Sequence, residues 1–346
     1  MTPAFRIGYL GHGAYVPPTV LSNEDLATFV DTSDEWIQRR TGIRTRHVLA
    51  GDESILEMAV EASRRALDRA GLEPGQIDDI RVGVSTWMRL PSLATQVQKT
   101  LGVGSASASD ISAGCAGFVY AVEEAWQKIV FERLLYGRET HALAIGVDGL
   151  SHITDWNDRS TCVLLGDGAG AVVVGEVEHG GILATHTHAD GNQGHLLYSE
   201  TPPPDPAHVP ERAPRVHDTG GRQYLRMDGR RVFGAAVQTM VSDVKMVLAK
   251  YAKLSGRRVG VEDIDFLFPH QANVRILEMV AKRLGVPIER VYTDGIAKYG
   301  NTSAASIPLG YEDMRYRFNG SPHPRLEVDV AFGSGFASGA ILREVP

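Results

Sequence analysis

Cysteine is scarce in this sequence of 346 residues, which contains only Cys115 and Cys162. Two cysteines cannot form the framework of several disulfides that stabilises small secreted domains. Free thiols suit a reducing compartment, so we expect a cytoplasmic protein. The first residues lack a basic stretch followed by an apolar one, so we expect no secretory signal.

Two further features are missing: an excess of basic residues and a long apolar run. The sequence has 35 Lys and Arg against 42 Asp and Glu, a formal net charge of -7. Nucleic-acid-binding proteins normally carry a basic excess, so we expect no nucleic-acid partner. No apolar run approaches the roughly 18 residues that cross a bilayer, so we expect no membrane partner either.

Glycine, in contrast, is abundant, with 37 residues, which suits many tight turns between strands and helices. Short apolar runs alternate with helical patterns, and this alternation predicts an α/β fold. Several of the runs are apolar on both faces, as in a sheet covered on both sides. Strands are expected at residues 81–85, 142–147, 163–165, 171–174, 266–268 and 326–330. Helices are expected at 54–71, 115–130 and 232–251.

Two pairs of segments echo each other along the chain. Residues 72–84 and 260–268 both place an Ile and an Asp before a buried strand, and residues 164–177 and 331–345 both run from a Gly-rich turn into an apolar strand. Their shared order predicts a duplication, with an N-terminal half at 1–178 and a C-terminal half at 179–346. The Pro-rich stretch 201–215 predicts a surface insertion.

The first candidate for chemistry is Cys115, in the segment DISAGCAGFVYAVEEAW. Small residues lead into a helix that is expected to begin at or beside the cysteine. Free N–H groups and the positive dipole end at a helix N-terminus stabilise a thiolate, so the pattern predicts a lowered thiol pKa. A buried structural cysteine is the alternative that this segment alone leaves open.

Three further segments place polar groups at the ends of apolar runs. His270 in LFPHQANVRI can donate to an oxyanion or transfer a proton, and Asn301 in KYGNTSAASIPL can donate to an enolate oxygen. Backbone N–H groups around Ser334 in AFGSGFASGA can form an oxyanion hole. Taken singly, each segment has a plainer interpretation: a hydrogen-bonded histidine, a helix cap and a turn.

Taken together, these four segments closely resemble β-ketoacyl-acyl-carrier-protein synthase III. Their order matches that family, as do DTSDEWIQRRTGIR at 31–44 and LLGDGAGAVVV at 164–174. The resemblance covers about residues 6–345 apart from the Pro-rich insertion. It implies a thiolase-like, five-layered αβαβα fold built from two duplicated halves, the first with the nucleophilic cysteine and the second with the His and Asn.

The resemblance also implies a reaction, a decarboxylative condensation of an acyl-CoA with malonyl-acyl-carrier protein (malonyl-ACP). Cys115 would carry the acyl group, while His270 and Asn301 would hold the enolate oxygen formed when CO2 is lost. The backbone N–H groups of Cys115 and Ser334 would hold the tetrahedral oxyanion. The family usually has a smaller residue at the position of Ser334, a change that a backbone donor tolerates. No metal or redox cofactor is expected, because decarboxylation generates the nucleophile.

Further residues take their expected roles from the resemblance alone. The acidic carrier is expected to dock on a basic helix face, although Gly234 stands where some members have a basic residue. A homodimer is expected, in which a loop residue, here Leu90, closes the acyl pocket of the partner. The expected CoA-binding residues are Trp36, Arg40, Arg159 and Asn273; the acyl-pocket residues are Leu90 and Phe332; the docking residues are Arg275, Lys282 and Arg283.

Other members of the fold match less well. A thiolase needs a second cysteine in the C-terminal Gly-rich turn, an HMG-CoA synthase needs a glutamate near residues 82–86, and non-decarboxylating acyltransferases often lack the asparagine; this sequence differs at each point. A starter-unit condensing enzyme or acyltransferase of a polyketide or signal-molecule pathway remains open, because its chemistry and residues are similar.

Two other functions are disfavoured by the sequence. Gly8, Gly11 and Gly13 have the wrong spacing for a dinucleotide-binding turn, and prolines follow where a helix should start. His186 and His188 alternate on an expected strand, with His195 nearby. Alternate strand residues share a face, but no family role matches these histidines, so the sequence predicts no metal site.

Overall fold

The computed structural model describes residues 5–199, 224–316 and 323–346, so the predicted insertion at 201–215 lies outside the described residues. A first mixed sheet has five strands in the order β1-β7-β6-β4-β5. Within it β4 pairs in parallel with β5 and β6, while β7 pairs antiparallel with β1 and β6. The strands are β1 (Arg6–Tyr15), β4 (Asp79–Gly83), β5 (Ser107–Ile111), β6 (Ala142–Gly149) and β7 (Asp167–Val177).

A second mixed sheet has four strands among the described residues, in the order β11-β12-β13-β8. Its first pair is parallel and the other two are antiparallel. The strands are β8 (Gly181–Ala189), β11 (Phe266–Pro269), β12 (Arg325–Phe332) and β13 (Ala337–Val345). Two short ribbons, β2 (Val20–Ser22) with β3 (Thr45–His47) and β9 (Leu197–Tyr198) with β10 (Arg226–Met227), lie outside the two sheets.

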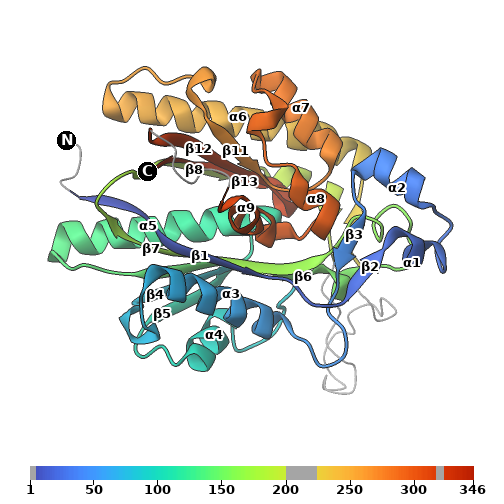
Figure 1. Ribbon diagram of the computed structural model, residues 1–346, viewed down its shortest axis with the longest axis horizontal. Helices are drawn as coiled ribbons and strands as arrows, with labels where there is room; N and C mark the ends of the chain where they lie inside the picture. The colour runs from blue at the N-terminus through green and yellow to red at the C-terminus, as the bar shows by residue number, and fades with distance from the viewer. Residues whose placement is uncertain (1–4, 200–223, 317–322) are drawn as a thin grey trace, which may run out of the picture.

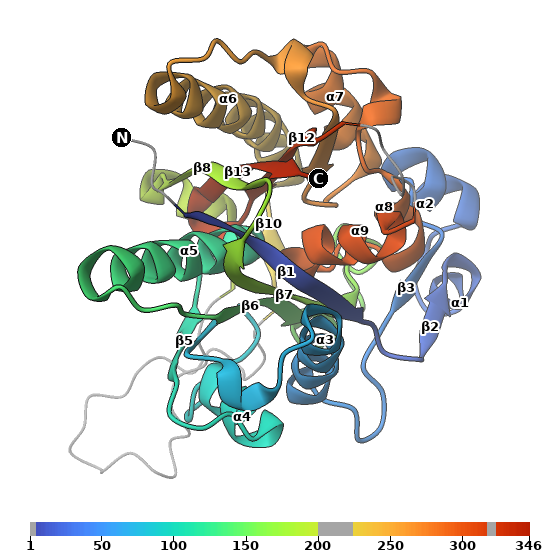
Figure 2. The ribbon, with the colours of Figure 1, turned by 60° about the vertical axis from the view of Figure 1, so that its left-hand side comes forward.

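Helices cover both sheets and separate them, so the molecule has five layers (Figure 1). The two views agree that α5 (Gly117–Tyr136) and α9 (Ser306–Met314) lie between the sheets (Figure 2). Helices α3 (Ile55–Ala70) and α4 (Leu93–Leu101) cover the outer face of the first sheet, and α6 (Gly229–Ser255) and α7 (Val274–Leu284) cover the second. The predicted five-layered α/β fold is therefore confirmed.

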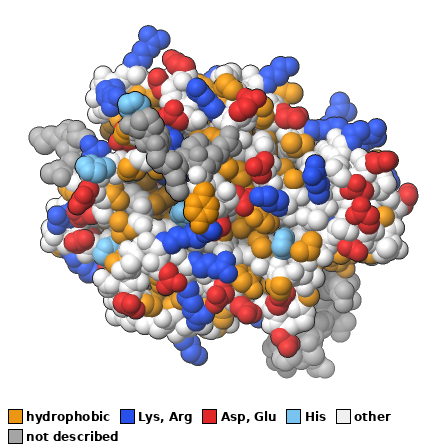
Figure 3. All heavy atoms as spheres, viewed as in Figure 1, with side chains coloured by type: hydrophobic (Ala, Val, Ile, Leu, Met, Phe, Trp, Pro, Cys, Tyr) orange, Lys and Arg blue, Asp and Glu red, His pale blue; other side chains and the backbone are white. Residues whose placement is uncertain are grey.

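Three shorter helices lie at one end of the layers, around β2 and β3. They are α1 (Asn23–Ala27), α2 (Asp34–Thr41) and α8 (Asp294–Tyr299). Acidic and basic side chains are interspersed over the face of the molecule drawn in Figure 3.

The two halves repeat one arrangement of elements. In each half the order along the chain includes an edge strand (β1 or β8), an outer helix (α3 or α6), the fourth strand of the sheet counted from that edge (β4 or β11) and a second outer helix (α4 or α7). The segments whose sequences echo each other fill equivalent places in the two sheets. The chain changes sheet between Val177 and Gly181; the division of the domains near residue 178 stays a prediction.

The predicted helices are present with adjusted ends. Ser54 caps α3 by accepting a hydrogen bond from the N–H of Glu57, and Gly71 ends the helix with φ at 66°. The helix predicted from Cys115 begins at Gly117, after a 3-10 turn. By length and composition α6 is long and apolar enough to cross a membrane, but its apolar face, with Met240 and Val244 buried, packs on β8 and β13 as a core helix.

The strand predicted at residues 163–165 is wrong. The chain there forms turns, and only Leu165 makes an isolated bridge, to Asn301. Val163 is buried in a small separate core with Leu26 and Ile37, beneath α1 and α2. Its carbonyl accepts a hydrogen bond from Arg46 at 2.9 Å. The apolar residues at 163–165 therefore belong to a loop, and Val163 packs in the small core beneath α1 and α2 and not in a sheet.

Candidate active site

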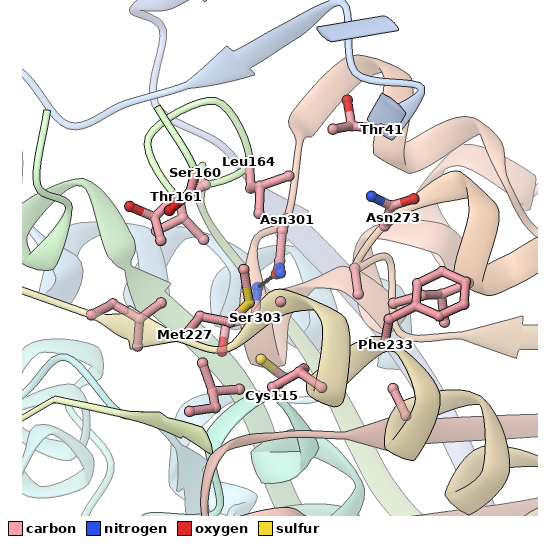
Figure 4. Close-up of a pocket in the computed structure, with 18 of the residues that line it drawn as sticks. Thr41, Cys115, Ser160, Thr161, Leu164, Met227, Phe233, Asn273, Asn301 and Ser303 are labelled. Atoms are coloured by element: carbon pink, nitrogen blue, oxygen red, sulfur yellow. Dashed lines mark hydrogen bonds between the residues drawn. The ribbon is translucent and has the colours of Figure 1, made fainter. Parts of the chain in front are cut away.

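A cavity of about 790 Å³ lies where the two halves meet. It is lined by segments far apart in the sequence, and the close-up places Cys115, Ser303 and Asn301 next to one another (Figure 4). Most of the residues expected to form the site share this cavity. They are Trp36, Arg40, Cys115, Arg159, His270, Asn273, Arg275, Asn301, Phe332 and Ser334.

Cys115 lies in the short 3-10 turn η2 (Gly114–Ala116), pressed against the Gly-rich turn of the other half. Gly114 has φ at 55°, and a Cβ there would lie 2.5 Å from the backbone nitrogen of Ser334. A Cβ on Gly333 would lie 2.3 Å from the backbone nitrogen of Cys115. Since backbone atoms cannot yield that much space, both positions need glycine for the two turns to approach so closely.

The Cys115 thiol is neutral in this state. The residue is half-buried because it faces the cavity, yet protein atoms surround the sulfur, and burial raises the pKa of the thiol to about 12 against a smaller lowering effect from the Ser303 side chain. The predicted lowering of the thiol pKa is therefore wrong for the free site. Desolvation raises the thiol pKa by more than the N-terminus of the helix lowers it, because that helix begins two residues later.

His270 follows the last residue of β11 and is buried. Its Nδ1 lies 2.7 Å from Oγ of Ser306, and the same Oγ accepts a bond from the N–H of Gln271 at 3.3 Å. The hydroxyl proton of Ser306 can therefore go to Nδ1, which leaves the ring proton on Nε2. Burial lowers the pKa of His270 to about 4 and outweighs a hydrogen bond to the Ser303 backbone, which raises the pKa, so the imidazole is neutral near pH 7.

The Asn301 carboxamide is oriented by its own chain. Its Oδ1 accepts a hydrogen bond from the N–H of Ser303 at 2.9 Å, so the side-chain NH2 remains as the donor that lines the cavity. The backbone of Asn301 is tied to the opposite loop: its N–H donates to Leu164 at 2.8 Å, and its carbonyl accepts from Gly166 at 2.9 Å. The interior thus offers two neutral donors, on His270 and Asn301.

The Gly-rich turn after β12 forms another part of the wall. The turn η9 (Ser334–Phe336) has two residues with positive φ, Gly335 at 70° and Phe336 at 51°. Phe332 precedes it, lines the cavity, and packs edge-on against Phe336 with ring centroids 4.9 Å apart. The turn therefore brings the backbone of Ser334 and the ring of Phe332 to the same cavity.

Sequence reasoning missed three polar residues of this site. Ser303 has φ at 51° and lowers the pKa of both Cys115 and Asp148 by hydrogen bonding, while Ser306 supports His270. Asp148, at the end of β6, is fully buried; its Oδ1 accepts from the N–H groups of Ser85 and Thr86, and burial raises its pKa to about 6. The NTSAAS segment contained both serines, but only the fold reveals their partners.

Aromatic and basic side chains meet at one part of the cavity. The guanidinium carbons of Arg40 and Arg159 each lie 5.0 Å from the ring centroid of Trp36. Asn273 caps α7 by accepting from the N–H of Arg275, and its amide donates to the carbonyl of Arg40 at 3.2 Å. The Asn273 side chain thus joins α7 to α2, and its expected role with CoA stays a prediction.

Three of the expected residues lie away from the cavity of their own chain. Leu90 is 92% exposed on the loop before α4. Lys282 and Arg283 are exposed in the last turn of α7. Their expected roles concern a second copy of the chain and a carrier protein, neither of which is present.

The apolar lining also contains residues without a recognisable sequence signal. Phe233 of α6 lies at the cavity together with Met227 of β10 (Figure 4), and Leu197 of β9 also lines it. Met227 and Leu197 come from short strands whose pairing depends on the tertiary fold. The cavity is therefore more apolar than the motifs alone indicate.

Comparisons with known proteins agree on one family. Residues 109–191 match the model for 3-oxoacyl-[acyl-carrier-protein] synthase III, and residues 254–345 match the model for its C-terminal part. A β-ketoacyl-[acyl-carrier-protein] synthase III from Thiobacillus denitrificans is 42% identical over 335 residues, with 96% of this chain and 97% of that protein covered.

Solved structures are similar over nearly the whole chain. The 3-oxoacyl-[acyl-carrier-protein] synthase III from Aquifex aeolicus is 39% identical, with a TM-score of 0.82, and the alignment covers 98% of this chain and 99% of that one. The priming β-ketosynthase from the R1128 polyketide pathway is 34% identical, with a TM-score of 0.83, and covers 100% of this chain and 98% of that one.

Proposed function

Because the chain belongs to the 3-oxoacyl-[acyl-carrier-protein] synthase III family, we propose that Cys115, His270 and Asn301 are its catalytic residues. The protein is an acyl-transferring condensing enzyme that initiates fatty-acid synthesis by joining an acyl-CoA primer to malonyl-ACP. The observation that supports the assignment of roles is the single cavity that joins one thiol to two oriented neutral donors.

The first step transfers the acyl group to the enzyme. The Cys115 sulfur attacks the thioester carbonyl of acyl-CoA, a new C–S bond forms, and the bond to CoA breaks. Since the resting thiol is protonated, its proton leaves during the step, and the departing CoA sulfur is the final acceptor. The backbone N–H groups of Cys115 and Ser334 hold the tetrahedral oxyanion.

The second step generates the carbon nucleophile. When malonyl-ACP loses CO2, the electron pair of the broken C–C bond moves toward the thioester oxygen, which becomes an enolate. His270 and Asn301 donate hydrogen bonds to this oxygen, and one preorganised donor of this kind is worth roughly a hundredfold in rate. The carbanion then attacks the acyl-Cys115 carbonyl, and the C–S bond to Cys115 breaks to release β-ketoacyl-ACP. The Cys115 thiolate takes up a proton from solvent, which restores the thiol. Thioester substrates supply this chemistry without a cofactor.

Binding and assembly follow from the same proposal. Trp36, Arg40 and Arg159 bind the nucleotide end of CoA by stacking and charge, and Asn273 lies beside that path. Arg275 at the cavity, with Lys282 and Arg283 further along α7, docks the acidic carrier. The enzyme acts in the cytoplasm as a homodimer in which Leu90 and Phe332 help to form the acyl pocket.

A second candidate, the priming of a polyketide pathway, has one observation in its favour. The R1128 priming ketosynthase is similar over the whole chain, and its chemistry would use the same three residues. The two functions differ in the acyl primer and in the carrier protein. The acyl-CoA that the enzyme uses as its primer distinguishes between them.

Intact-mass measurement tests both the roles and the primer. The wild-type chain is incubated with a panel of acyl-CoAs and then with malonyl-ACP. We expect an acyl adduct that disappears on the second addition, no adduct on Cys115→Ala, and an adduct that persists on Asn301→Ala. An adduct on Cys115→Ala at the wild-type level would refute the assignment of the nucleophile.

A further inference from the structure

Outside the active site, the structure brings together two histidines and one aspartate from different elements. His186 and His188 lie two residues apart on β8 and point to the same face of the second sheet, toward α6. Asp243 lies on α6, which packs on that face. One ligand atom from each of the three lies within 4.8 Å of the others.

The contacts within this cluster are close and polar. Nε2 of His188 lies 2.8 Å from Oδ1 of Asp243, and Nε2 of His186 lies 3.8 Å from the same oxygen. Ser338, directly opposite His188 on β13, places its Oγ 3.0 Å from Nε2 of His188. Two imidazoles and a carboxylate, with a hydroxyl beside them, are the donor types that bind Zn²⁺ and similar divalent ions.

The charges near the cluster favour a cation. Asp243 is fully buried, and its Oδ2 has no hydrogen-bond partner. A buried carboxylate with an unused oxygen needs compensation. Glu123 adds negative charge from α5, where it binds the hydroxyls of Thr185 and Thr187. The positive charge of the nearby Lys250 disfavours a bound metal ion, but its ammonium donates a hydrogen bond to the carbonyl of Thr185 at 2.9 Å.

The cluster is open on one side. β8 is at one edge of the second sheet, and the side chains of His188, His186 and Asp243 are 43%, 16% and 0% exposed. An ion therefore has a path from solvent to the buried carboxylate. Tetrahedral zinc places its ligand atoms roughly 3.4 Å apart, so the donors need to move by about 1 Å or less.

We propose that His186, His188 and Asp243 form a structural site for a divalent transition-metal ion such as Zn²⁺, which ties the edge strand β8 to helix α6. The ion replaces the direct contact between His188 and Asp243 and uses the second carboxylate oxygen. Ser338 or water completes the coordination. The site takes no part in the condensation and stands apart from the proposed function; it reverses the prediction from the sequence, which saw the histidines without Asp243.

The test measures zinc binding to the untagged full-length chain in a Cys115→Ser background, so that the active-site thiol is not a ligand. The protein is freed of metal with a chelator and titrated with ZnCl2 by calorimetry, and its melting temperature is measured with and without zinc. We expect one equivalent per chain and a rise in melting temperature. Cobalt in place of zinc is expected to show visible absorption from a low-symmetry site with nitrogen and oxygen ligands.

Two variants and a matched control decide the outcome. His188→Ala, at a half-exposed position, is expected to bind zinc at least tenfold more weakly, as is Asp243→Asn. His195→Ala, an exposed histidine of the next turn, is expected to bind like the parent. Circular dichroism checks the fold of each variant, and His186→Ala replaces Asp243→Asn if that chain does not fold. Zinc binding that is absent in the parent, or equal in His188→Ala and His195→Ala, overturns the proposal and leaves the cluster as a hydrogen-bonded contact.

Discussion

The hydroxyl of Ser306 lies 2.7 Å from Nδ1 of His270, where it can donate to that nitrogen and leave the ring proton on Nε2. Ser306 begins α9, one of the helices between the sheets, while His270 directly follows β11 of the second sheet. The bond therefore couples the central helix layer to His270, the proposed donor to the substrate oxygen.

Replacing Ser306 with alanine should misorient His270 without removing it. We expect decarboxylation of malonyl-ACP to slow by about ten- to a hundredfold, since the Nε2 donor is no longer held in place. Acylation of Cys115 should change by less than about twofold, because that step uses the backbone oxyanion hole. The two half-reactions are measured separately, with Ser255→Ala at the end of α6 as the control. An equal loss in both half-reactions would indicate a general structural defect.

The decarboxylation step should be insensitive to pH between about 5 and 7. His270 has a pKa near 4 because it is buried, against an ordinary value of about 6.5, so it stays a neutral donor over this range. The unfolded chain binds this proton below about pH 6.5 and the folded chain does not. The effect of His270 therefore leaves the free energy of unfolding at its full value above pH 6.5 and lowers it as the pH falls toward 4.

Decarboxylation by the Cys115→Ala variant, followed across this range, tests the first part of this prediction. A transition centred near pH 6.5 would contradict the neutral, buried imidazole. Urea unfolding of wild type and His270→Gln at pH 7.5 and pH 5 tests the second part: the variant should lose less stability on acidification.

Trp36 should contribute to binding of CoA and not to chemistry. With Arg40 and Arg159 each 5.0 Å from its ring, the indole offers a stacking surface beside two cations. We expect Trp36→Ala to raise KM for acyl-CoA by about tenfold, the loss of one or two stacking contacts, with kcat within about twofold. Trp156→Ala, in the same small core but outside the cavity lining, is the control. A fall in kcat at unchanged KM would argue against this role.

Leu90 should influence the choice of primer through a second copy of the chain. Its side chain is 92% exposed and does not line the cavity of its own chain. If the loop closes the partner's acyl pocket, Leu90→Phe narrows that pocket and shifts kcat/KM from medium-chain acyl-CoAs toward acetyl-CoA. Met88→Phe, on the same loop and 51% exposed, is the matched control. Unchanged chain-length preference in Leu90→Phe would reject the role.

Arg343 should be essential for stability. Its guanidinium binds Asp329 at 2.8 Å and Glu327 at 3.0 Å in the core, and lies 4.8 Å from the rings of Tyr9 and Tyr311. Arg343→Ala leaves the buried Asp329 without its cationic partner, while Glu327 keeps Arg325 at 3.3 Å, and is expected to lower the free energy of unfolding by about 3–5 kcal/mol.

Denaturant unfolding measures the effect of Arg343→Ala. The control Arg6→Ala breaks an exposed ion pair to Glu344 and should cost about 1 kcal/mol or less. Adding Asp329→Asn to Arg343→Ala should recover part of the loss, because it removes the carboxylate charge that lost its partner. No recovery would mean that the cost arises from lost packing.

Much of the architecture was predictable from the sequence, because local patterns carry it. The helix from Ser54 to Gly71 has its cap, its apolar face and its terminating glycine in one segment. The echoed segments predicted that the chain repeats itself, and they fill equivalent places in the two sheets. The run at 163–165 was misassigned because an apolar run does not reveal which core it joins.

By itself, then, the amino-acid order indicated an α/β fold through its periodicity. Its motifs in a fixed order indicated the family, the five-layered architecture that the family implies, and the residues proposed to carry chemistry. Only the tertiary structure decided the protonation of those residues, because burial of Cys115 and His270 comes from elements that are remote in sequence. The same holds for Ser306 beside His270 and for Asp243 beside His186 and His188. Such partners come from other strands and helices, and no local pattern encodes that proximity.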